Sequence, residues 1–151
     1  MIDINGIAHI QLSVRDFAAC RAFYFALCHE TFGMSIQYDQ PDCFYCIGGR
    51  TGVMITPAEK PEPFHQRRAG LHHLCFRARS AEDIDLLHKR LVEMGAHVVH
   101  APEEGSWAKG YYSVLFEDPE GIRLEANYVP GRGNLDRIAE GGPIADRFSE
   151  S

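Results

Sequence analysis

The sequence predicts an α+β fold built from two βαβββ modules, and the main support is an internal repeat. The segment GIAHIQLSVRD, residues 6–16, recurs as GLHHLCFRARS, residues 70–80, at an offset of 64 residues. Further along, GRTGVMIT, residues 49–56, recurs as DPEGIRLE, residues 118–125, at an offset of 69 residues. Strand-like and helix-like patterns follow in the same order in both copies. Two copies of this length indicate a pair of fused modules rather than a solenoid.

The first module begins with alternating apolar and polar residues over 6–14, which predicts a strand. Residues 17–28, FAACRAFYFALC, predict a helix with Asp16 as its N-cap. Three short runs bounded by turn residues then predict strands at 34–39, 43–48 and 51–57.

The second module repeats this order. Residues 70–78 predict a strand, and Ser80 is placed to cap a helix over 81–95 that ends at Gly95. The apolar residues of this helix share one face, namely Ile84, Leu87, Leu91 and Met94. Three further strands are predicted near 96–100, 111–117 and 121–128.

The chain length of 151 residues predicts a single domain that contains both modules. The modules span about 4–57 and 70–129. A Pro-rich linker over 57–69 joins them, and a Gly-rich C-terminal tail occupies 130–151.

The composition argues against several kinds of partner. The formal net charge of -6, with no basic run, argues against binding to nucleic acid or to an anionic membrane. No apolar stretch approaches the roughly 20 residues needed to cross a bilayer, and MIDINGIAHI lacks the features of a signal peptide. The cysteine count of five is odd, so reduced thiols are expected. We therefore expect a cytoplasmic protein.

Two histidines and a carboxylate fall on equivalent faces of the predicted sheets. Strand side chains alternate between two faces, and the apolar set must cover the module's helix. His9, His73 and Glu125 then lie on the opposite side, here called the ligand face, whereas His72 lies on the helix side. Three such side chains can hold a divalent metal as a facial triad with positions open for water and substrate, and zinc also accepts them.

Other polar residues are expected on or near the ligand face. Gln11 and Arg123 share it and are candidate substrate-binding residues, because a guanidinium offers a bidentate fork to an anionic group. Tyr112 precedes the DPEG turn and is the candidate for a catalytic hydroxyl if it faces this side, with packing into the core as the alternative.

The double βαβββ order, with HIQLSVRDFAACRAFY, LHHLCFRARS and YYSVLFEDPEGIRLEANY, resembles the vicinal oxygen chelate superfamily. That group includes glyoxalase I, extradiol dioxygenases, fosfomycin-resistance thiol transferases and bleomycin-binding proteins. The resemblance covers residues 6 to about 128, and 116–125 is its most specific part. It implies sheets that curl into an incomplete barrel around a metal-binding cavity.

The resemblance also implies four ligand slots, at His9, Thr56, His73 and Glu125. Thr56 departs from the pattern of glyoxalase I and the epimerases, in which a carboxylate in this slot is both ligand and base. A threonine hydroxyl cannot serve as both ligand and base at neutral pH. Because water can fill the vacant ligand position, Thr56 is still a candidate catalytic residue. Tyr111 or Tyr112 would match the tyrosine of the ring-cleaving dioxygenases.

The resemblance therefore implies an enzyme with one divalent metal ion (Fe, Mn, Zn or Ni) acting on a small oxygen-chelating substrate. Dioxygenase-like or glyoxalase-like lyase or isomerase chemistry is expected. The alternatives are a fosfomycin-type thiol transferase, a non-catalytic antibiotic-binding protein, and a metal-holding domain whose partner supplies the activity. Members of the antibiotic-binding group generally lack the metal ligands. Related two-module proteins commonly dimerise, so a homodimer is expected.

Overall fold

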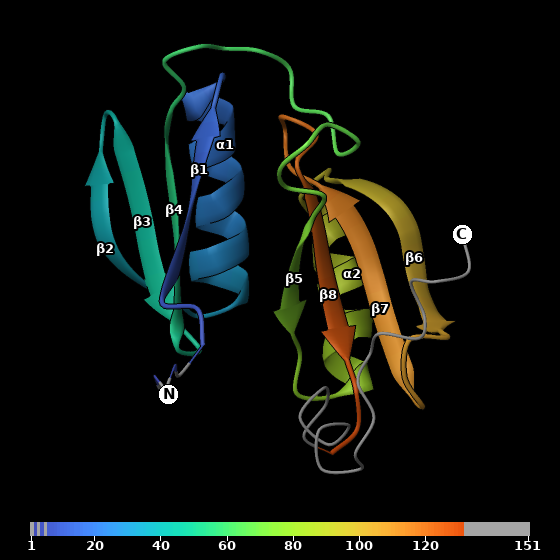
Figure 1. Ribbon diagram of the computed structural model, residues 1–151. Helices are drawn as coiled ribbons and strands as arrows, with labels where there is room; N and C mark the ends of the chain where they lie inside the picture. The colour runs from blue at the N-terminus through green and yellow to red at the C-terminus, as the bar shows by residue number, and fades with distance from the viewer. Residues whose placement is uncertain (1, 3, 5, 132–151) are drawn as a thin grey trace.

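The protein consists of two four-stranded sheets, each accompanied by a helix (Figure 1). The structure is a computed structural model that describes residues 2, 4 and 6–131. The first module contains β1 (His9–Val14), α1 (Phe17–Tyr24), the π-helix η1 (Phe25–Thr31), β2 (Ser35–Gln40), β3 (Cys43–Gly48) and β4 (Thr51–Pro57). The second contains β5 (Leu74–Arg77), α2 (Ala81–Glu93), β6 (His97–Gly105), β7 (Tyr111–Glu117) and β8 (Arg123–Tyr128). This confirms the α+β class and its two repeated modules.

The two sheets have the same strand order, which is the structural counterpart of the sequence repeat. The order is β1-β4-β3-β2 in the first sheet and β5-β8-β7-β6 in the second. The first and last strands of each module pair in parallel, and the remaining pairs are antiparallel. Within the described part of the chain, no strand of one sheet pairs with a strand of the other, so both sheets stay open. The incomplete barrel is therefore not closed by hydrogen bonds in one chain.

Strand alternation buries one apolar face of each sheet against its helix, as expected from the sequence. Leu12 and Val14 of β1 are buried in the first module, and Leu124 and Ala126 of β8 are buried in the second. The buried residues of α2 are Ile84, Leu87 and Leu91. Each such aliphatic side chain contributes about 1.5–3 kcal/mol when it leaves water. All of these residues belong to one continuous core that spans both modules.

Both predicted helix caps are present. The Asp16 carboxylate accepts a hydrogen bond from the backbone N–H of Ala19 at 3.0 Å, and the Ser80 hydroxyl accepts one from Asp83 at 3.1 Å. Each bond satisfies a backbone donor that the first turn of a helix leaves without a partner. The caps therefore fix where the chain turns from each first strand into its helix.

The largest differences from the expected element boundaries fall in three elements. The α-helical part of the first helix ends at Tyr24, and a π-helix continues to Thr31. Strand β6 extends to Gly105, five residues beyond the predicted end. Strand β5 begins at Leu74 rather than at residue 70, so the strand alternation used to place the preceding residues does not apply to them. Beyond Gly131, the predicted tail lies outside the described residues.

Polar contacts join the two modules, from α1 and the two residues before it to the turn that connects β7 to β8. The hydroxyl of Tyr24 donates to the Asp118 carboxylate at 2.9 Å. The backbone N–H of Asp16 donates to the Glu120 carboxylate at 2.8 Å, and the Arg15 guanidinium binds the same carboxylate. As Figure 1 shows, α1 lies between the two sheets. These contacts fix how the two ligand faces sit relative to each other.

No described helix has both the length and the apolar character that a membrane crossing requires.

Candidate functional site

The second module brings two of the predicted metal ligands together. His73 Nε2 lies 3.1 Å from Oε2 of Glu125. Glu125 is in the middle of β8, between the buried residues Leu124 and Ala126, so its side chain projects from the ligand face. The Glu125 side chain is 13% exposed and that of His73 is 35% exposed. The pair is therefore sheltered but open to a small molecule.

The carboxylate of Glu125 has two further neighbours on the ligand face. The hydroxyl of Tyr111, the first residue of β7, donates a short hydrogen bond to its Oε1. Cys75 is the direct cross-strand partner of Glu125 in β5. Although Cys75 is exposed at the surface of the sheet, loss of solvation and the Glu125 carboxylate raise the pKa of its thiol to about 12. The thiol is therefore protonated at neutral pH.

His72 contacts His73, contrary to the expectation that the two histidines point to opposite faces. Their Nδ1 atoms are 2.7 Å apart, and their rings meet edge to face with centroids 5.0 Å apart. The physical reason is that both residues precede β5, which starts at Leu74, so the pleat does not separate them. One imidazole donates and the other accepts, which makes His72 the partner of the His73 nitrogen that faces away from Glu125.

Tyr112 does not lie on the ligand face, so the catalytic placement is wrong and the alternative of packing on the core side holds. The Tyr112 hydroxyl donates to the Asp85 carboxylate of α2 at 2.8 Å, which places it on the helix-covered side. The adjacent Tyr111 takes the opposite face and reaches Glu125. The signal was present in the sequence: Val114 and Phe116 of β7 are buried, and Tyr112 shares their parity.

Arg123 lies on the ligand face of β8, as expected. Its Nε donates to Oε1 of Glu117 at 3.3 Å, and the other oxygen of that carboxylate lies 2.7 Å from Nδ1 of His97. Arg123 is therefore held at the edge of the site by an acidic neighbour. Its use in binding substrate stays a prediction.

His9 lies on the other sheet, in the first strand of the first module. It is exposed, directly opposite Gly52 of β4, and its ring meets that of Tyr45 at 6.5 Å between centroids. Among the described residues, no three His, Cys, Asp or Glu side chains are close enough to hold one metal ion. Within one chain, then, His9 does not complete the site of His73 and Glu125.

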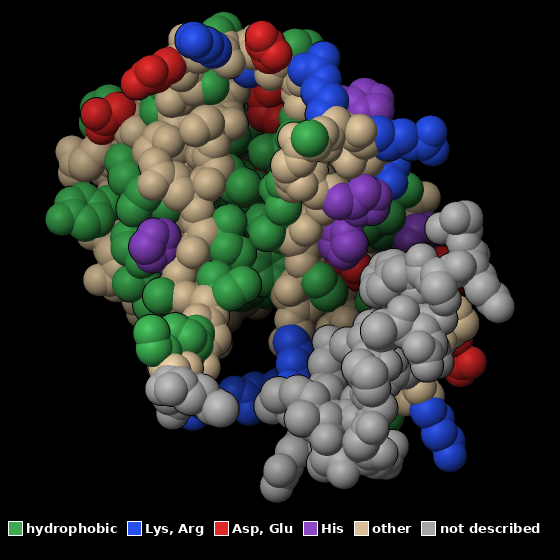
Figure 2. Space-filling view, in the orientation of Figure 1, with side chains coloured by type: hydrophobic (Ala, Val, Ile, Leu, Met, Phe, Trp, Pro, Cys, Tyr) green, Lys and Arg blue, Asp and Glu red, His purple; other side chains and the backbone are tan. Residues whose placement is uncertain are grey.

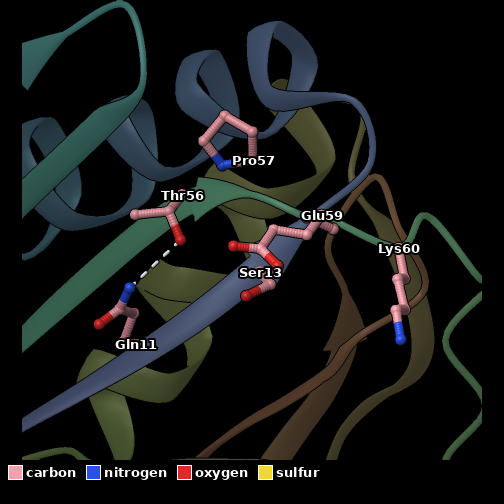
Figure 3. Close-up of a pocket in the computed structure, with 7 residues that line it drawn as sticks. Gln11, Ser13, Thr56, Pro57, Glu59 and Lys60 are labelled. Carbon is pink, nitrogen blue, oxygen red and sulfur yellow. Dashed lines mark hydrogen bonds between the residues drawn. The ribbon is translucent and has the colours of Figure 1, made fainter.

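Thr56 and Gln11 line a separate open pocket on the first module, with a volume of about 470 Å³. Gln11 Nε2 donates to the Thr56 hydroxyl at 3.2 Å (Figure 3). The remaining lining residues are Ser13, Pro57, Ala58, Glu59 and Lys60. This pocket offers hydroxyl, amide, carboxylate and ammonium groups, which suits a polar substrate rather than an apolar one.

The sheet register puts a different residue in the first-module position that corresponds to Glu125. In the second module Cys75 is opposite Glu125, whereas in the first module Gln11, the repeat equivalent of Cys75, is opposite Met54. Thr56 is therefore two residues, or one pleat repeat, beyond the position that Glu125 occupies. By the sheet register, the fourth ligand slot is therefore occupied by Met54 of β4, next to the strand that carries His9. Thr56 lies further along β4.

The space-filling view shows the surroundings of these groups. Figure 2 shows hydrophobic side chains gathered between the two modules, with histidine side chains on both sides of them. The first module exposes large apolar groups on its ligand face: Tyr38 is 59% exposed and Ile47 is 41% exposed. Exposed apolar side chains that are surrounded by polar ones are typical of an interaction surface.

Comparison with known proteins gives one consistent result. Residues 6–126 match the family described as the Glyoxalase/Bleomycin resistance protein/Dioxygenase superfamily. The chain is 31% identical over 130 residues to the uncharacterized protein YqjT of Bacillus subtilis (strain 168), covering 78% of this chain and 94% of that one.

Solved structures agree with this match. A lactoylglutathione lyase from Agrobacterium tumefaciens is 25% identical, with a TM-score of 0.62, over 83% of this chain and 94% of that one. The fosfomycin resistance protein FosX from Listeria monocytogenes is 19% identical, with a TM-score of 0.63, over 84% of this chain and 95% of that one. The second of these likenesses concerns the fold alone.

Proposed function

Because the chain belongs to the Glyoxalase/Bleomycin resistance protein/Dioxygenase superfamily, we propose that it is a divalent-metal-dependent enzyme acting on a small oxygen-chelating substrate. The observation that carries the proposal is the contact between His73 and Glu125. His73 and Glu125 would hold one ion of iron, manganese, zinc or nickel together with His9.

The donor set and its spacing fit a metal ion. When His73 carries its proton on Nδ1, its Nε2 and the Glu125 carboxylate oxygen are both acceptors, and a cation between them at 3.1 Å would satisfy both. Two ligands that bind one ion at about 2.0–2.2 Å and at right angles lie about 3 Å apart. The contact with His72 assigns a partner to Nδ1 of His73 and leaves Nε2 facing Glu125, as is usual for a metal-binding histidine.

In this proposal the third ligand, His9, comes from a second copy of the chain. His9 is exposed on a ligand face that also carries exposed apolar side chains, whereas the face with Glu125 carries mainly polar ones. A homodimer that packs the first module of one copy against the second module of the other would cover the apolar face and bring His9 to His73 and Glu125. Such a pairing is isologous, so it would create two equivalent sites.

In this site the metal would supply Lewis-acid polarisation of a substrate oxygen. Arg123 would bind an anionic part of the substrate, and Gln11 with Thr56 would form polar contacts from the pocket on the first module. Covering both ligand faces would exclude water, which strengthens each of these interactions. Lyase or isomerase chemistry is the first candidate, because the lactoylglutathione lyase match is 25% identical, and dioxygenase chemistry is the second.

The first experiment measures bound metal and turnover. We expect about one divalent ion per chain in the purified protein, and turnover in one arm of a panel of methylglyoxal with glutathione, catechols, and fosfomycin with a thiol. A protein that binds metal and turns over none of these has a different substrate. A protein that takes up no divalent ion contradicts the proposal.

A mixing experiment tests the shared site. His9→Ala and Glu125→Gln should each be inactive alone. If the site spans two chains, random exchange of subunits between the two variants makes half of the dimers mixed. Each mixed dimer has one intact site of its two, so activity recovers to about a quarter of the wild-type value. A site built within one chain would give no recovery.

A further inference from the structure

The two oxygens of Glu125 have different partners. Oε2 lies 3.1 Å from His73 Nε2, whereas Oε1 accepts the hydrogen bond from the Tyr111 hydroxyl. Tyr111 comes from the start of β7 and Glu125 from the middle of β8, so the contact runs diagonally across two paired strands. The carboxylate is therefore fixed in rotation about its last bond, with one oxygen turned toward the histidine.

Tyr111 is itself held rigidly. It is buried, and it is directly opposite Gly105 in the antiparallel pair of β6 and β7. A Cβ placed on Gly105 would lie 2.7 Å from Cδ1 of Tyr111, so the ring rests on the bare backbone of that glycine. Two carbon atoms that are not bonded to each other cannot approach this closely. The methyl group of Gly105→Ala would therefore displace the Tyr111 ring.

We propose that Tyr111 is a positioning residue that occupies Oε1 of Glu125 and so restricts this carboxylate to binding metal through Oε2 alone. The inference rests on the proposed metal function and specifies how the site is prepared for it. A carboxylate that binds through one oxygen uses one coordination position instead of two. The freed position is then available to a substrate that chelates through two oxygens.

The test compares two single-atom changes at neighbouring residues. Tyr111→Phe removes the hydroxyl that binds Glu125, and Tyr112→Phe removes the hydroxyl that binds Asp85 on the other face. Mn²⁺ is titrated into metal-free protein by calorimetry. Loss of a partner of a metal ligand typically weakens metal affinity about 10- to 100-fold, which is the change expected for Tyr111→Phe. Tyr112→Phe should bind Mn²⁺ like the wild type.

A second readout separates positioning from general damage. Water-proton relaxation counts the water molecules on bound Mn²⁺, and Tyr111→Phe should lose about one of them as Glu125 becomes bidentate. Gly105→Ala keeps the hydroxyl but displaces the ring, and it should reproduce the loss of affinity. In a Glu125→Gln background, adding Tyr111→Phe should change the affinity no further, because the two act as one unit.

The outcomes distinguish this inference from the proposed function. If the wild type binds Mn²⁺ and Tyr111→Phe binds it equally tightly with the same number of waters, the positioning role is wrong and the metal function stands. If Tyr111→Phe weakens binding equally in both the wild-type and the Glu125→Gln backgrounds, Tyr111 does not act through Glu125. If the wild type binds no divalent ion, both proposals fail together.

Discussion

The hydroxyl of Tyr24 in α1 donates a 2.9 Å hydrogen bond to the carboxylate of Asp118, which follows β7 in the other module. Both side chains are buried, at 1% and 4% exposed. Asp118 also accepts from the backbone N–H groups of Glu120 and Ile122, so it organises the turn between β7 and β8 while it binds α1. One carboxylate thus couples the local geometry of the DPEG turn to the packing of the two modules.

Replacing Tyr24 by phenylalanine should destabilise the protein by about 1–3 kcal/mol, since it leaves a buried carboxylate oxygen without its side-chain donor. Chemical denaturation measures this change. Tyr38→Phe is the matched control, because Tyr38 is 59% exposed. The unfolding free energy of this variant should lie within about 0.5 kcal/mol of the wild-type value. Equal stability of the Tyr24 variant and the wild type would show that this bond does not hold the modules together.

Glu120 should make the stability of the protein sensitive to acid. Burial alone would raise the pKa of Glu120, but the Asp16 N–H and the Arg15 guanidinium outweigh it, and the pKa is lowered below its ordinary value of 4.5. Because the folded-state pKa lies below that of the unfolded chain, the stabilisation is present above pH 4.5 and is lost as the pH falls through the folded-state value.

The difference in unfolding free energy between wild type and Glu120→Gln measures this contribution. We expect about 1–3 kcal/mol at pH 7, shrinking as the pH falls below 4.5. Burial raises the pKa of the neighbouring Asp118, so Asp118 contributes to the pH dependence of stability with the opposite sign. The difference between wild type and Glu120→Gln is therefore more informative than the wild-type curve alone. A difference that stays constant down to the acid transition would contradict the assignment.

Divalent metal should stabilise the folded protein through Glu125. A ligand at 100 times its dissociation constant adds about 2.7 kcal/mol, which raises the melting temperature measurably, and a chelator should reverse the effect. Glu125→Gln should abolish the shift. Glu117→Gln is the matched control, since Glu117 is another sheet carboxylate with a histidine, His97, at 2.7 Å. A metal-induced shift that survives in the Glu125 variant would place the ion elsewhere.

The fold could be predicted because its signals are local. The alternation of β1 and β8, the caps at Asp16 and Ser80 and the apolar stripe of α2 are each set by residues within a few positions of one another. The repeat then supplied the topology, since equivalent segments adopt equivalent strand orders. The contact between His73 and Glu125 is consistent with the repeat, which puts His73 directly before β5 and Glu125 in β8, the strand that pairs with β5.

The rest of the site depends on contacts that a local pattern does not contain. The contact of His72 with His73 depends on where β5 begins, and strand ends are set by the packing of the whole sheet. The separation of His9 from Glu125 depends on how α1 packs between the modules, which no segment of sequence specifies alone. Tyr111 is the exception, because the alternation of β7 was sufficient to choose it over Tyr112.

The register of the first module leads to a prediction about the missing fourth ligand. Met54 stands where Glu125 stands in the second module, since Gln11 is opposite Met54 and Cys75 is opposite Glu125. Met54→Glu should therefore place a carboxylate beside His9, on the sheet face that carries the histidine. Such a fourth ligand, a carboxylate oxygen, should raise the affinity for Mn²⁺ or Zn²⁺ by about tenfold or more, which is about 1.4 kcal/mol.

The matched control for this change is Thr56→Glu. That variant adds the same charge to the same strand, one pleat repeat further on, where the side chain meets Gln11 and the polar pocket. If the sheet register decides the ligand slot, only Met54→Glu raises the affinity measured by calorimetry, and His9→Ala cancels the gain. If the sequence repeat decides it instead, Thr56→Glu gives the gain and Met54→Glu gives none, because a carboxylate two residues away along a strand is displaced by about 6.6 Å.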